Sequence, residues 1–184
     1  MEGVEVAVKR YLAGDGSALD ALREFGLLNR QEPATRGYVL YKALKYGIDV
    51  SSYVKYLDWR EFEEFIRYVF SEFGYNVVSN VRLNCGRSAE FDVVAWSRDV
   101  AFVVEAKKWK GGGGKWEEIA CKHLKKVKMC ISKLLVFAPF VVPLVISSTD
   151  VNFISGGVPV VSIRKIGNFL ASFHDFKNYV IILK

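Results

Sequence analysis

Residues 90–107 read EFDVVAWSRDVAFVVEAK. Two apolar runs, Glu90–Trp96 and Val100–Ala106, are joined by the short polar connection Ser97-Arg98-Asp99. Apolar runs of this length around a polar turn predict a β-hairpin. The two runs are therefore expected to be neighbouring strands of a sheet.

Three charged side chains interrupt the apolar hairpin. Because positions two apart on a strand point to the same face, Glu105 and Lys107 are expected to be neighbours. Asp92 lies among Phe and Val residues, where an uncompensated carboxylate costs on the order of several kcal/mol. One interpretation is that these are separate edge charges, with Asp92 paired to Arg82 or Arg87. The other is a shared metal site, because carboxylates are the ligands that Mg²⁺ prefers.

The segments around the hairpin alternate between strand and helix patterns. A helix, three strands, a helix, two strands and a helix are expected in this order, at residues 58–74, 76–81, 90–96, 100–106, 116–135, 142–147, 158–163 and 166–173. Residues 179–183 are expected to add an edge strand. This order predicts an α/β fold with a mixed central sheet flanked by helices.

The helix before the sheet has an explicit beginning. Asp58 can cap it, and Glu61 three positions later is the reciprocal partner of a capping box. Shorter helical patterns precede it. The chain is therefore expected to divide into a small helical N-terminal extension, residues 1–57, and an α/β domain, residues 58–184.

The positive charge is concentrated in one segment. The chain carries a formal net charge of +6, and residues 107–133 contain nine lysines against Glu117 and Glu118, so the remainder sums to about −1. A charge run alone is most often a solvated helix face. Beside a candidate acidic site it favours a polyanionic partner, because phosphate contacts supply most non-specific nucleic-acid affinity.

The order and spacing of these residues resemble those of a nuclease superfamily. Asp92, with Glu105-Ala106-Lys107 thirteen positions on, resembles the PD-(D/E)XK motif. Phe62-Glu63 and the turn Gly74-Tyr75-Asn76-Val77 are similar to the opening of the Mrr-like restriction endonuclease branch. The resemblance covers residues 58 to about 173 and implies a restriction-endonuclease-like core. Phe91 stands where the motif has its proline.

The resemblance implies hydrolysis of DNA phosphodiester bonds with Mg²⁺, which Mn²⁺ is expected to replace. By position, the catalytic set would be Glu63, Asp92, Glu105 and Lys107. Asp92, Glu105 and the backbone carbonyl of Ala106 would bind the metal, and Lys107 would position the attacking water. Glu63 would hold a second metal or its water shell, in preference to Glu64, which falls further towards solvent.

Lysines follow the hairpin directly. Candidate DNA contacts near the four glycines at 111–114 and on the next helix are Lys108, Lys110, Lys115, Lys122 and Lys126. Lys122, Lys125 and Lys126 are three or four apart and are expected on one helix face. The run Gly-Gly-Lys lacks the Ser or Thr that follows in a P-loop, so no nucleotide cofactor is expected. His123 and His174 have no metal-ligand spacing and are interpreted as structural or exposed.

The three cysteines, Cys85, Cys121 and Cys130, form an odd set without a close pair. This pattern indicates neither a disulfide framework nor a cysteine zinc site, and a reducing compartment, the cytoplasm, is expected. The apolar stretch Leu134–Ile146 is thirteen residues long and contains two prolines. It predicts a helix end followed by a buried strand and not a membrane span.

Three alternatives to an Mrr-like endonuclease stay open, one of them a structural or interaction protein whose helical N-terminus matters most. Holliday-junction resolvases share the core and differ in how dimers present two sites, so a homodimer is compatible with either enzyme. A DNA-binding module that has kept the fold and lost activity would bind DNA in a salt-sensitive way that is indifferent to metal.

Overall fold

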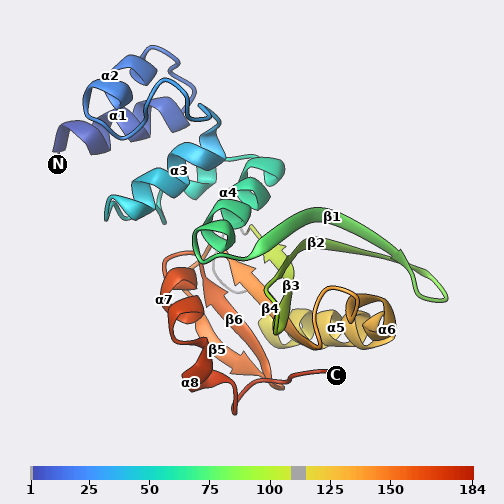
Figure 1. Cartoon of the computed structure of the whole chain (residues 1–184). Coiled ribbons are helices and arrows are strands. Elements are labelled where there is room, and N and C mark those ends of the chain that lie inside the picture. Colours follow the sequence, from blue (N-terminus) through green and yellow to red (C-terminus); the bar gives the residue numbers. More distant parts are fainter. Residues whose placement is uncertain (1, 109–114) are drawn as a thin grey trace. The chain divides into compact units, whose positions relative to one another are not determined.

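The computed structural model describes residues 2–108 and 115–184 (Figure 1). The chain divides into two compact units, Met1–Tyr68 and Val69–Lys184. This division falls within helix α4 (Trp59–Glu72), whereas the sequence placed a boundary between residues 57 and 58.

The first unit is built from short helices around a small apolar core. They are α1 (Glu2–Leu12), α2 (Ala18–Glu24), α3 (Arg36–Lys45), the 3-10 helix η1 (Val54–Tyr56) and the first part of α4. The predicted capping box of α4 is confirmed. The backbone N–H of Asp58 donates to Glu61 Oε2 at 2.7 Å, and the N–H of Glu61 donates to Asp58 Oδ1 at 2.8 Å. These reciprocal bonds satisfy N–H groups at the helix start that would otherwise lack a partner.

The second unit contains a six-stranded mixed sheet with the strand order β1-β2-β3-β4-β6-β5. The strands are β1 (Asn76–Asn84), β2 (Ser88–Trp96), β3 (Val100–Lys107), β4 (Phe140–Ser147), β5 (Asn152–Ser155) and β6 (Val158–Ser162). β1, β2 and β3 form antiparallel pairs, β3 pairs with β4 and β4 with β6 in parallel, and β5 is antiparallel to β6. The predicted α/β fold with a mixed, helix-flanked sheet is confirmed.

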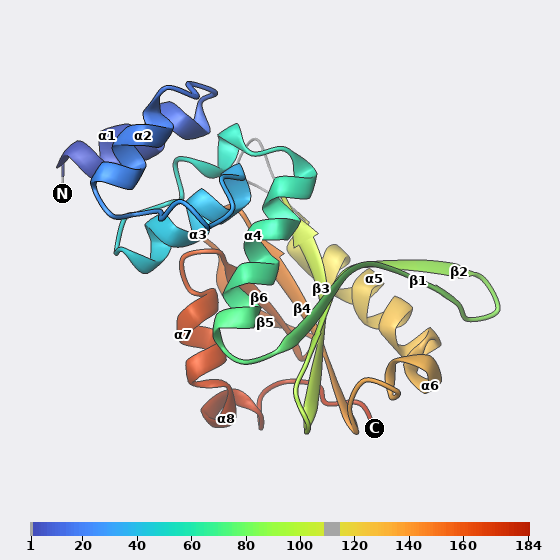
Figure 2. The ribbon, with the colours of Figure 1, turned by 45° about the horizontal axis from the view of Figure 1, so that its top comes forward.

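Helices cover both faces of this sheet, as Figures 1 and 2 show. α5 (Trp116–Met129) and α6 (Ile131–Leu134) lie on one face, and α7 (Ile166–Ala171) and α8 (Phe173–Phe176) lie on the other. Phe102 of β3 packs among aromatic rings on the second face, with a centroid distance of 4.8 Å to Phe173 and 5.8 Å to Phe70. The strands that carry charged residues are therefore held between two apolar layers.

Four elements differ from the sequence prediction, one of them the helix expected at 166–173, which is divided into α7 and α8. The predicted helix at 116–135 is two helices, because α5 ends at Met129 and α6 begins at Ile131. β5 was not predicted, since a four-residue edge strand with three exposed positions has no clear alternation. The edge strand predicted at 179–183 is wrong, because this segment makes a single isolated bridge, between Leu183 and Val141.

The cysteine interpretation also needs correction. Cys85 and Cys130 form a disulfide with their Cα atoms 5.2 Å apart, although 45 positions separate them in the sequence. Cys121 is a free, exposed cysteine. Cys85 lies at the end of the β1–β2 hairpin and Cys130 follows α5, and their proximity arises from the packing of these elements and not from local spacing. Among the described residues, no helix combines the length and apolar character needed to cross a membrane.

Candidate active site

The β2–β3 hairpin brings Asp92 and Glu105 to one face of the sheet. The antiparallel ladder pairs Val93 with Val104, so one step further along it Asp92 lies opposite Glu105. Asp92 Oδ2 accepts a hydrogen bond of 2.7 Å from the backbone N–H of Ala106. This bond fixes the Asp92 carboxylate beside β3, and the two carboxylates therefore share one side of the hairpin.

Glu105 is surrounded by nitrogen atoms. Lys107 Nζ donates to its Oε1 and Lys126 Nζ donates to its Oε2, each at 2.6 Å. His123 Nδ1 lies 3.5 Å from Oε2, an ion-pair distance that is long for a hydrogen bond. His123 Nε2 lies 2.8 Å from the carbonyl oxygen of Val103, which only accepts, so Nε2 carries the hydrogen.

These contacts determine the charge of Glu105. Burial alone would raise its pKa, but the polar contacts with His123, Lys107 and Lys126 outweigh burial. They hold the pKa of Glu105 well below its ordinary value of 4.5. Glu105 is therefore an ionised carboxylate at neutral pH.

Asp92 has a different electrostatic environment. Burial raises its pKa above the ordinary value of 3.8, and the negative charge of Glu105 adds to this rise, while the hydrogen bond from Ala106 acts in the opposite direction. Within residues 2–108 and 115–184, no lysine, arginine or histidine forms an ion pair with Asp92. A partly buried carboxylate in this state would be stabilised by a cation bound next to it.

The backbone of β1 has an unusual conformation at the position opposite Asp92. The β1–β2 ladder pairs the residues on either side of Asn80, which places Asn80 opposite Asp92. Asn80 has a φ of 56°, and no other non-glycine residue in the described part of the chain has a positive φ. Asn tolerates this conformation better than most residues, and such positions are enriched at functional sites. The strand pairing is thus interrupted beside the carboxylate pair.

The donor set fits a hard divalent cation. Asp92 and Glu105 offer carboxylate oxygens, which Mg²⁺ and Mn²⁺ prefer. The N–H and C=O of one strand residue point to the same edge, so the Ala106 carbonyl lies on the side of Asp92. In the described ranges, no three His, Cys, Asp or Glu side chains gather closely enough to hold a metal alone. The residues therefore suit an ion that completes its shell with water and substrate oxygens, as Mg²⁺ usually does.

Glu63, the fourth predicted site residue, belongs to the first unit, and its role stays a prediction. Its exposed fraction is 3%. The neighbouring Glu64 accepts a hydrogen bond of 2.9 Å from Thr35 Oγ1 and lies 3.4 Å from the hydroxyl of Tyr68. Glu64 is thus engaged within the helical unit, and Glu63 is the more buried of the two.

The predicted DNA-contacting lysines have different environments. Lys122 pairs with Glu118 at 2.5 Å, and Lys115 lies 3.9 Å from the same residue. Lys108 directly follows β3. Lys110 lies outside the described residues. Lys122, Lys125 and Lys126 line one hollow, which agrees with the helix face expected from their spacing.

Two residues of α5 take part in the site in ways that the sequence analysis missed. Lys126 was expected only as a DNA contact, but its Nζ bonds Glu105 Oε2, donates to the Glu90 carbonyl at 2.8 Å and lies 5.1 Å from the Phe91 ring centroid. His123 is 2% exposed and faces Glu105. Their three-residue spacing predicts a shared helix face, but no local pattern says that this face meets β3.

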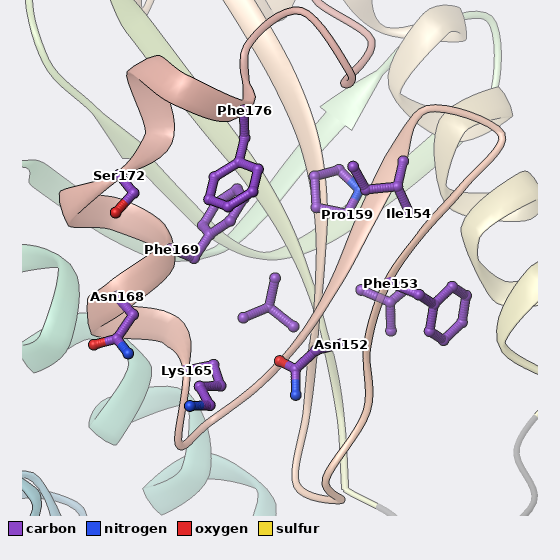
Figure 3. A pocket seen from close by; sticks show the side chains of 11 residues that line it. Asn152, Phe153, Ile154, Pro159, Lys165, Asn168, Phe169, Ser172 and Phe176 are labelled. Atoms are coloured by element: carbon purple, nitrogen blue, oxygen red, sulfur yellow. The ribbon is translucent and has the colours of Figure 1, made fainter.

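A second hollow, of about 570 Å³, lies away from these residues, between β5, β6, α7 and α8. Figure 3 shows Phe169 and Phe176 on its helical side and Pro159 and Ile154 on its strand side. Its lining contains no carboxylate, so it does not suit a divalent cation. None of the site residues predicted from the sequence lines this hollow.

The fold and the paired carboxylates define an α/β protein with a candidate active site on the β2–β3 hairpin. Residues 58–148 match the sequence profile of the nuclease-related domain family (NERD). The matched range includes α4, the hairpin with Asp92, Glu105 and Lys107, and α5. This match supports a nuclease-type domain in this part of the chain.

No curated protein matches the chain. One solved structure, of a protein of unknown function designated AF1548, is similar with a TM-score of 0.44 and 16% sequence identity. The similarity covers 62% of this chain and 65% of that one, so the chain spans somewhat less than two thirds of its length.

Proposed function

We propose that the protein is a Mg²⁺- or Mn²⁺-dependent nuclease that hydrolyses DNA phosphodiester bonds, most similar in action to Mrr-like endonucleases. The observation that carries the proposal is the pairing of Asp92 with Glu105 on one face of the hairpin, with Lys107 Nζ 2.6 Å from Glu105 Oε1. The nuclease-related domain match covers the same residues and supports the same class of reaction.

The residues of the hairpin would have distinct tasks. Asp92, Glu105 and the Ala106 carbonyl would hold the cation. When bound, the cation would supply a more acidic water and polarise a phosphoryl oxygen. Lys107 would orient the attacking water and offset negative charge that develops on the phosphate. Glu63 would act on a second cation or its water shell.

Digestion of several DNA forms tests this proposal. Linear, circular, single-stranded and four-way-junction DNA would be incubated with Mg²⁺, with Mn²⁺ or with a chelator. We expect metal-dependent cleavage by the wild-type protein, none by Glu105→Ala, and strongly slowed cleavage by Lys107→Ala. Lys128→Ala, which removes an exposed lysine of α5, serves as the matched control and should cleave normally.

The pattern of substrates separates the alternatives. Cleavage confined to four-way junctions would indicate a resolvase instead of an Mrr-like endonuclease. Salt-sensitive binding without cleavage, unchanged by metal and by Glu105→Ala, would replace the enzyme with a DNA-binding module.

A further inference from the structure

A basic hollow of about 460 Å³ lies between the β1–β2 hairpin and helix α5. Its hairpin wall consists of residues 87–90, and its helix wall consists of Lys122, Lys125, Lys126 and Met129. Figures 1 and 2 show the hairpin extending on the side of the sheet where α5 and α6 lie. Four cationic side chains thus face a single carboxylate, that of Glu90, which is itself paired with Arg82 at 3.3 Å.

Two of the four cations have no carboxylate partner among residues 2–108 and 115–184. Arg87 donates from Nε to the sulfur of Met129 at 3.1 Å, a contact that reaches from one wall to the other. Its terminal amino groups, and the ammonium group of Lys125, form no ion pair with any residue in the described part of the chain. The hollow therefore carries positive charge that no ion pair within the described segments neutralises.

The disulfide keeps the two walls of the basic hollow together. Cys85 lies two positions before Arg87, and Cys130 directly follows Met129. The bond between them ties the end of the hairpin to the end of α5, so the distance from Arg87 to the lysines of α5 is restricted without a ligand. A site whose groups are already positioned loses less free energy on binding.

The basic hollow is connected to the candidate active site through Lys126. This side chain lines the hollow, and its Nζ also lies 2.6 Å from Glu105 Oε2. A polyanion in the hollow would therefore be next to the carboxylate pair.

We propose that the basic hollow binds the sugar–phosphate backbone of a DNA strand that continues from the candidate active site. The guanidinium of Arg87 can engage one phosphate with two parallel hydrogen bonds, and Lys125 contacts a second phosphate as a point charge. The proposal rests on the proposed nuclease function for its choice of DNA as the ligand. It adds a wall of the binding site, residues 87–90 of the β1–β2 hairpin, that is not part of the proposed catalytic set.

Binding of a short fluorescent DNA duplex, measured by anisotropy at several salt concentrations with metal chelated, tests this proposal. The double variant Arg87→Ala/Lys125→Ala should bind more weakly, on the order of tenfold or more at low salt. The slope of log K against log salt should fall by about 1.8, since each lost phosphate contact removes about 0.9.

Two further variants serve as controls. Lys128→Ala/Lys133→Ala removes the same charge from exposed positions of α5 and α6 outside the basic hollow, and its slope should stay that of the wild type. Arg87→Lys/Lys125→Arg keeps the charge and should largely restore binding. Circular dichroism verifies that every variant is folded.

The outcomes separate this inference from the nuclease proposal. Equal weakening by the two alanine pairs, or an unchanged slope for Arg87→Ala/Lys125→Ala, would overturn the phosphate site even if the wild-type protein cleaves DNA. A selective loss of slope would support the phosphate site even if no cleavage is found, because binding is measured without metal.

Discussion

Replacing Lys126 with methionine tests how the second unit compensates the charge of Glu105. Lys126 Nζ lies 2.6 Å from Glu105 Oε2, and the two side chains are 27% and 15% exposed. The lysine also lies over the Phe91 ring, 5.1 Å from its centroid. Methionine keeps most of the apolar stem and removes the charge. Glu105 would then depend mainly on Lys107, at 2.6 Å from Oε1.

The expected loss follows from this geometry. Removing one partner of a fully buried ion pair costs about 3–5 kcal/mol, and a hydrogen bond to a charged group contributes roughly 1.5–3 kcal/mol. Because both side chains are partly exposed and Lys107 remains, we expect the free energy of unfolding to fall by about 2 kcal/mol. For a chain of 184 residues this corresponds to a decrease in Tm of about 4–8 °C.

Lys122→Met is the matched control for this experiment. It removes the same charge from the same helix, but its partner Glu118 is 47% exposed and Lys122 itself is 74% exposed. An exposed pair at this spacing contributes about 0.3–0.5 kcal/mol, so its Tm should change by less than about 2 °C. Thermal and urea unfolding of both variants, followed by circular dichroism at neutral pH, give the comparison. Equal shifts for the two variants would refute the assignment of Lys126 as the cation that compensates Glu105.

The pH dependence of the Lys126→Met effect has a defined sign. The pKa of Glu105 is lower in the folded protein than its ordinary value of 4.5, so the unfolded chain binds more protons near that pH. The stability that this carboxylate contributes is present above pH 4.5 and is lost as the pH falls towards its folded pKa. The difference between Lys126→Met and the wild type should therefore be full at neutral pH and shrink below pH 4.5.

Three other perturbations have expected outcomes. Asp92→Asn should stabilise the second unit at neutral pH, because the pKa of Asp92 is raised in the folded protein and its charged form is therefore disfavoured there. Urea unfolding should show this gain in the free energy of unfolding at neutral pH and its loss below pH 3.8. Lys107→Ala should slow single-turnover DNA cleavage by about 10²–10³-fold, on the scale of one lost transition-state donor, with little change in DNA affinity; a normal rate would exclude Lys107 from catalysis. Cys85→Ala/Cys130→Ala should lower stability by up to about 4 kcal/mol, the chain-entropy value for a closed loop of this length. A reductant should bring the wild-type Tm down to that of this variant, and a Tm insensitive to reductant would contradict the role of the disulfide.

Much of the hairpin was predictable because its signals are local. Alternation of side chains on β3 places Glu105 beside Lys107, and a short turn fixes the register that sets Asp92 opposite Glu105. The capping box of α4 depends only on Asp58 and Glu61, three positions apart. Each of these features follows from residues that are close in sequence or joined by one turn.

The contacts between α5 and the sheet were not predictable in the same way. Cys85 meets Cys130 across 45 positions, and Lys126 reaches Glu105 across 21. Both contacts depend on which face of α5 packs against β3 and the hairpin. The helix sequence contains several polar and apolar stripes and does not identify which of them packs there. The spacing of the lysines predicts a basic helix face. Only the fold shows that Lys126 on this face contacts Glu105, whereas Lys125 faces the basic hollow.

This division gives the lysines of α5 two separate tasks. Lys126 turns inward and offsets the charge of Glu105, because a carboxylate of low exposure needs a cation close by. Lys125, one position earlier, faces the basic hollow without a carboxylate partner among the described residues. Loss of Lys126 should therefore affect stability and the candidate site, whereas loss of Lys125 should affect only the binding of a polyanion. If loss of Lys126 and loss of Lys125 produced the same defect, charge compensation and substrate binding would not be separate tasks of these two lysines.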